Sequence, residues 1–78
     1  MIYSVFLLLP HTWLIGQIHF EDVPDIGEFV EITPRAKFKV TELDSIKKTV
    51  TLRFEVIFHD SDIRSILLQE FDFKESGW

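Results

Sequence analysis

Residues 49–58 have the sequence TVTLRFEVIF, in which polar and apolar side chains alternate. The apolar positions share one face of the segment and the polar ones the other, which is the two-residue period of a half-buried β-strand. A second alternating run, residues 36–43, directs Phe38 and Val40 inward and its two lysines outward. Residues 44–48 connect the two runs. We therefore predict an antiparallel hairpin.

Three further strands are expected in the N-terminal half of the chain. Residues 2–9 and 12–20 are almost continuously apolar, and Pro10 marks the turn between them, because proline cannot donate to a strand ladder. The segment 21–27, which is rich in acids and contains proline and glycine, has the composition of a surface loop. A short strand at residues 28–33 follows it.

After His59 the periodicity changes from two residues to that of a helix. Asp60, Ser61 and Asp62 are N-cap candidates, and apolar residues then recur at the i, i+3, i+4 and i+8 positions Ile63, Ile66, Leu67 and Phe71. We predict an amphipathic helix of about two to three turns that covers the sheet. The alternative is a strand over residues 63–73, which would place Ser65 and Gln69 in the core. Residues 74–78 are expected to form a loose tail.

These elements predict a mainly β fold in a single domain spanning residues 1–78. Its core is a small curled, mostly antiparallel sheet or an SH3- or OB-like barrel of about five strands, with one short C-terminal helix. A chain of 78 residues buries only about 60 to 65% of the surface that it exposes when unfolded. It contains no cysteine, so its stability has to come from packing or from oligomerisation.

The apolar N-terminal segments predict neither export nor membrane insertion. No Lys or Arg precedes Arg35, so a basic region of the kind that begins a signal peptide is missing. Polar residues, among them Gln17 and His19, interrupt the apolar run before it reaches the roughly 20 residues of a membrane span. We expect a cytoplasmic protein.

The first two strands are apolar on both faces, and a strand of this kind needs cover on both. One helix shields only one side of a sheet. The uncovered face is then expected to pack against a second copy of the chain or a dedicated protein partner, through Phe6, Leu8, Trp13 and Ile15. A closed barrel is the alternative, in which the two apolar faces are the barrel interior and the surface beneath the helix.

Charge is distributed unevenly. Residues 1–34 hold five acids and no Lys or Arg, whereas six of the eight basic residues lie between positions 35 and 53. We expect these six to form a charged surface for a partner: Arg35, Lys37, Lys39, Lys47, Lys48 and Arg53. A nucleic-acid backbone is the alternative partner. The sequence pI of about 5.0 and the inward alternation of the hairpin aromatics weigh against it.

Motifs for catalysis or cofactor binding are missing from the sequence. The spacing of His11, His19 and His59 matches no compact metal-ligand pattern, and no serine lies in the Gly-x-Ser-x-Gly setting of a nucleophile. Asp60 and Asp62 beside His59 form the only candidate cluster, and a helix start explains them. We therefore expect no enzyme, no cofactor and no metal, but a small interaction module (subunit, inhibitor or adaptor) that acts through protein–protein contacts. The alternative is a small β-barrel that binds nucleic acid with the hairpin 35–53.

Overall fold

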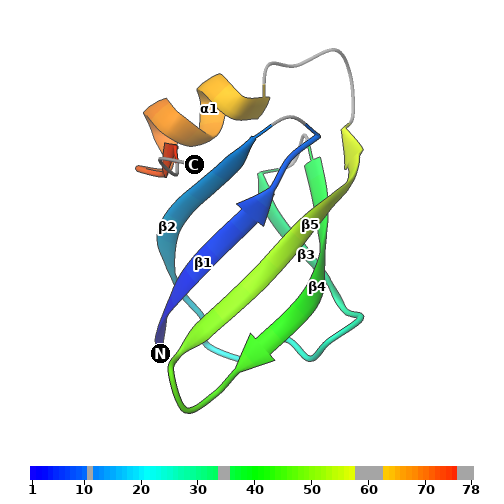
Figure 1. Cartoon of the computed structure of the whole chain (residues 1–78), viewed down its shortest axis with the longest axis vertical. Coiled ribbons are helices and arrows are strands. Elements are labelled where there is room, and N and C mark those ends of the chain that lie inside the picture. The colour runs from blue at the N-terminus through cyan, green and yellow to red at the C-terminus, as the bar shows by residue number, and fades with distance from the viewer. Residues whose placement is uncertain (11, 34–35, 58–62, 76–78) are drawn as a thin grey trace.

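The computed structural model describes residues 1–10, 12–33, 36–57 and 63–75 (Figure 1). These residues form six strands and one helix: β1 (Ile2–Leu8), β2 (Trp13–His19), β3 (Phe29–Thr33), β4 (Ala36–Asp44), β5 (Thr49–Ile57), α1 (Ile63–Glu70) and β6 (Lys74–Glu75). The strands make one sheet in the order β3-β4-β5-β1-β2-β6, which curls into a half-barrel. The prediction of a small, curled, mainly β fold with one short helix is confirmed.

Strand β1 lies between β2 and β5 and pairs differently with each. Its ladder with β2 is antiparallel, from Ile2 opposite His19 to Leu8 opposite Trp13. Its ladder with β5 is parallel, from Ser4 opposite Thr49 to Leu8 opposite Arg53. The start of β1 therefore lies near the β4–β5 turn, where Ser4 N donates to Lys48 O at 2.9 Å (Figure 1).

The predicted β4–β5 hairpin is present, with two register shifts between Lys37 and Phe38 and between Val40 and Glu42. Phe38 and Val40 are 0% and 1% exposed, as their alternation predicts. At the turn, Asp44 Oδ1 accepts hydrogen bonds from the backbone N–H groups of Ile46 and Lys47, each at 3.0 Å. Lys48 completes the turn in the left-handed conformation, with φ of 58°.

The core lies on the inner, concave side of the sheet. It consists of alternate strand residues together with residues of the helix and of the segment after it: Tyr3, Val5, Leu7, Leu14, Phe38, Val40, Val50, Leu52, Ile63, Leu67 and Phe73. Phe20, just after β2, joins this core through an edge-to-face contact with Tyr3, in which the ring centroids are 6.0 Å apart. The curl of the sheet and α1 together enclose these side chains.

Residues 63–70 form a helix, so the alternative of a second hairpin is excluded. Ile63 and Leu67 are buried and Ile66 packs partly buried beside them, as the helical spacing predicts. Phe71 departs from the expectation, because the helix ends at Glu70 and the Phe71 side chain is 38% exposed. Asp72 then adopts a φ of 60°, and the turn directs the next side chain into the core. The N-cap candidates 60–62 lie outside the described residues.

The segment that follows the helix joins the sheet. Phe73 is 3% exposed, and Lys74 and Glu75 pair with Ile15 and Leu14 as β6. Glu75 also forms an ion pair with Arg64 of α1. The buried ring fixes the chain beside β2, so that the two residues after it join the sheet. Residues 76–78 lie outside the described part of the chain.

Candidate interaction surface

The outer face of the β1–β2 ladder brings together the four apolar residues expected to contact a partner. Phe6 lies opposite Ile15, and Leu8 lies opposite Trp13. Directly opposed residues of an antiparallel pair project to the same side of the sheet. Their chain neighbours Val5, Leu7 and Leu14 are buried on the inner side, so these four project outward. We call Phe6, Leu8, Trp13 and Ile15 the apolar ridge.

The apolar ridge is partly open to solvent. Trp13 is 37% and Ile15 is 38% exposed, whereas Phe6 and Leu8 are half-buried. The helix does not cover them, because its buried residues Ile63 and Leu67 belong to the core on the inner side. The ridge is therefore an apolar sheet face without intramolecular cover from α1.

A polar strip borders the ridge along β5. The parallel ladder places Thr51 beside Phe6 and Arg53 beside Leu8. Where the ridge ends, a hollow of about 380 Å³ is lined by Leu8, Leu9, Pro10, Arg53 and Phe54. The ridge is therefore an apolar surface with a polar border along β5 and a hollow at one end.

The basic residues divide between the strands and the turn of the β4–β5 hairpin. Lys39 and Arg53 are register partners on the outer face, and Lys37 precedes them on the same face of β4. Lys47 and Lys48 lie in the turn. Lys39 precedes Asp44, the last residue of β4, by five positions, so about 17 Å of strand lies between it and the turn. Arg35 lies outside the described residues.

Acidic groups offset part of this positive charge. Arg53 Nη2 lies 2.8 Å from Glu55 Oε1, and this hydrogen bond, helped by the charges of Arg53 and Lys39, lowers the pKa of Glu55. At the turn, the hydrogen bonds from the Lys47 and Ile46 amides lower the pKa of Asp44. Both carboxylates are therefore held in the charged form beside the basic residues.

Two lysines lie over aromatic rings. Lys37 Nζ is 5.1 Å from the ring centroid of Phe29, and Lys48 Nζ is 5.6 Å from that of Tyr3. Phe29 is 55% exposed and lies on β3 opposite Lys39, so it adds an aromatic surface to the basic end of the sheet. The sequence interpretation missed this residue, although the alternation of residues 28–33 places Phe29 and Val30 on opposite faces.

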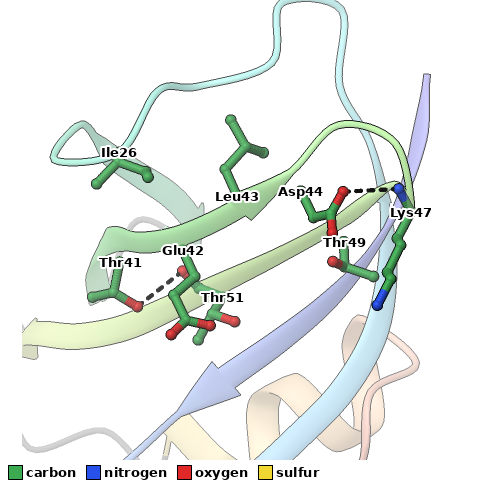
Figure 2. Close-up of a pocket in the computed structure, with 8 residues that line it drawn as sticks. All are labelled: Ile26, Thr41, Glu42, Leu43, Asp44, Lys47, Thr49 and Thr51. Atoms are coloured by element: carbon green, nitrogen blue, oxygen red, sulfur yellow. Dashed lines mark hydrogen bonds between the residues drawn. The ribbon is translucent and has the colours of Figure 1, made fainter.

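A polar hollow of about 430 Å³ lies at the turn end of the β4–β5 hairpin (Figure 2). Its lining residues are Ile26, Thr41, Glu42, Leu43, Asp44, Lys47, Thr49 and Thr51. Figure 2 shows two hydrogen bonds among these residues: Thr41 Oγ1 donates to Thr51 O at 3.3 Å, and Asp44 accepts from the Lys47 amide. With its pKa lowered, Asp44 is a poor proton acceptor. The shape of the hollow thus follows from the register shift between Val40 and Glu42 and from the β4–β5 turn.

Metal-binding geometry is not seen in the described ranges, where His, Cys, Asp and Glu side chains nowhere gather in threes in a way that could hold an ion. The cluster suggested by the sequence, His59 with Asp60 and Asp62, falls outside those ranges. The described helix is too short to cross a membrane.

Comparison with protein-family models, with curated proteins and with solved structures gave no match.

Proposed function

We propose that the protein is a non-enzymatic interaction module that self-associates through the apolar ridge. The observation that carries the proposal is the exposure of Trp13 and Ile15, 37% and 38%, on the sheet face that α1 does not cover. The module acts by presenting this face to a second copy of the chain. The proposal assigns it no catalytic residue and no cofactor.

The arrangement of the ridge suits a two-fold pairing. Two cross-strand pairs, Phe6 with Ile15 and Leu8 with Trp13, form a short apolar block on adjacent strands. A two-fold axis through such a block brings the same residues of two copies together, which is the commonest symmetry of soluble oligomers. Arg53 at the edge of the block then lies at the rim, where charge favours specificity more than affinity.

The expected association is moderate in strength. Burying a fully exposed apolar side chain of this size contributes about 1.5–3 kcal/mol. The four ridge residues are already partly covered, so each contributes less. Stable interfaces bury more than about 1,000 Å² in total. We therefore expect dissociation constants on the order of micromolar.

Light scattering over a range of protein concentrations tests the proposal. The wild-type chain should shift from monomer to dimer as concentration rises, and the double variant Trp13→Ser/Ile15→Thr should remain monomeric. Ile46→Thr is the matched control, because Ile46 is 92% exposed in the β4–β5 turn, outside the ridge. Circular dichroism checks that each variant is folded. A wild-type protein that stays monomeric at millimolar concentration contradicts the proposal.

Nucleic-acid binding is a second candidate, favoured by the exposed Phe29 ring beneath Lys37. Proteins that bind single strands combine backbone-tracking cations with aromatic rings on which bases stack. Labelled single-stranded oligonucleotides, titrated at two salt concentrations, test it. Binding should weaken as salt rises and should be reduced by Phe29→Ala and Lys37→Ala, while Lys47→Ala at the far end has little effect. The absence of binding at low salt excludes this function.

A further inference from the structure

The curled sheet leaves a groove between β2 and β3. These strands are not neighbours in the sheet, and no ladder joins them within the described residues. Their apolar side chains nevertheless line one groove of about 430 Å³: Ile18 and Phe20 on the β2 side, Val30 and Ile32 on the β3 side, and Phe71 after the helix. We call this groove the seam. It is where the half-barrel fails to close.

Within the described residues, no strand pairs with β3 on the side that faces the seam. On its other side it pairs with β4, where Val40 N donates to Glu28 O at 2.9 Å and Val30 lies opposite Phe38. Backbone groups of successive residues in an antiparallel strand point alternately to the two sides. The N–H and C=O of Phe29 therefore point away from β4. An open edge of this kind is a template for an added strand.

The charges on the β2–β3 connection beside this edge are negative, whereas Lys37 and Lys39 lie on the β4 side of Phe29. The connection from β2 to β3 and the exposed face of β3 carry the acids Glu21, Asp22, Asp25, Glu28 and Glu31, all of them exposed. Residues 1–34 themselves contain no Lys or Arg. Glu31 also lines the seam. An apolar groove with an acidic rim favours a ligand that is both apolar and basic.

Strand β4, which pairs with the other edge of β3, has this alternation of basic and apolar residues. Residues 37–40 of β4 have the sequence KFKV, in which lysine alternates with an apolar residue. Lys39 lies opposite Phe29, and Phe38 lies opposite Val30 with its side chain in the core. Strand β3 thus accepts apolar side chains on its inner face and lysines on its outer face along one edge.

We propose that the edge of β3 at Phe29 binds an extended segment of a partner protein in which basic residues alternate with apolar ones. The segment adds as a strand beside β3. Its apolar side chains enter the seam over Val30 and Ile32, and its basic side chains lie along the acidic rim. This binding uses a different face from the apolar ridge and does not depend on self-association.

A synthetic six-residue peptide of alternating lysine and valine, capped at both ends and fluorescently labelled, is the probe. Fluorescence anisotropy with the full chain should show saturable binding that weakens as salt rises. The same peptide with glutamate in place of lysine should not bind. Glu31→Lys should weaken binding roughly three- to tenfold, as reversal of a rim charge does. Glu42→Lys is the matched control, because it makes the same charge change at an exposed position of β4 away from the seam.

Amide hydrogen exchange locates the binding. The Phe29 amide should gain protection when the lysine–valine peptide is added, while the β4 amides that already pair with β3 should change little. Equal binding of the two peptides, equal effects of Glu31→Lys and Glu42→Lys, or protection confined to β1 and β2 would each overturn the proposal. Protection of Phe29 that appears without peptide as protein concentration rises would assign the edge to a second copy, and would overturn it also.

Discussion

The ring of Phe73 occupies the space that a β-carbon on residue 16 would need: a Cβ built on Gly16 lies only 2.8 Å from Cγ of that ring. Gly16 is in β2, directly beside the point where β6 pairs with Leu14 and Ile15. The glycine therefore lets Phe73, 3% exposed, lie against the sheet and fix the segment after α1.

We expect Gly16→Ala to destabilise the protein by about 1–3 kcal/mol, the usual cost of overpacking a core. Chemical denaturation measures the change. In a Phe73→Leu background the same substitution should cost less, because the smaller side chain leaves room for the methyl group. Equal costs in the two backgrounds would mean that the ring and the glycine are not coupled.

Substitutions at Lys48 distinguish the contribution of its backbone conformation to stability from that of its side chain. Lys48→Gly and Lys48→Ala both remove the ammonium group over Tyr3, but only glycine adopts a φ of 58° without a steric cost. The glycine variant should therefore be more stable than the alanine variant by about 1 kcal/mol. Thermal unfolding compares the two. A more stable alanine variant would show that the turn changes its conformation.

The protein should be less stable in acid, because the charged form of Asp44 in the β4–β5 turn is lost. The Lys47 and Ile46 amides lower the pKa of Asp44 from its ordinary value of 3.8, so the folded state favours the charged carboxylate. A lowered pKa stabilises the protein above the unfolded pKa, and this contribution is lost as the pH falls through the folded value. The melting temperature of Asp44→Asn should approach that of the wild type below about pH 4. A difference that is constant from pH 7 to pH 2 would rule out this linkage.

Leu67 should be the position in α1 most sensitive to truncation. Its side chain is fully buried, and Leu67→Ala should cost about 2–5 kcal/mol. Gln69→Ala, at an exposed position of the same helix, is the control and should be within about 0.5 kcal/mol of wild type. Denaturant titration of both variants gives the comparison. Similar stabilities for the two would mean that the helix does not pack on the core.

Much of the fold follows from local periodicity. Alternation in residues 49–58 predicted β5 and its partner β4, because the direction of a strand side chain depends only on its position. The i, i+3, i+4 spacing from Ile63 predicted α1, because the direction of a helix side chain likewise depends on its position in the sequence. The parallel pairing of β1 with β5 has no local signature, because it depends on how two hairpins pack together. The helical spacing wrongly predicted that Phe71 is buried, because the helix ends at Glu70 and a turn follows at Asp72.

The candidate surface was predictable in part. Alternation separates Phe6 and Leu8 from the core-facing Val5 and Leu7, but only the packing of α1 shows which face the helix covers. The basic residues share one stretch of sequence, yet Lys37 lies near the start of β4 and Lys47 lies in the turn after its end. The seam could not have been foreseen, since it arises from the curl of the whole sheet.

The position of β1 between β2 and β5 also sets the order in which the molecule assembles during translation. Residues 2–19 are synthesised before residues 49–57, so the edge of β1 that pairs with β5 stays open until β5 follows. Closing such a distant contact is slow compared with forming a hairpin. Until then the open edge of the hairpin exposes backbone groups that can pair with another chain.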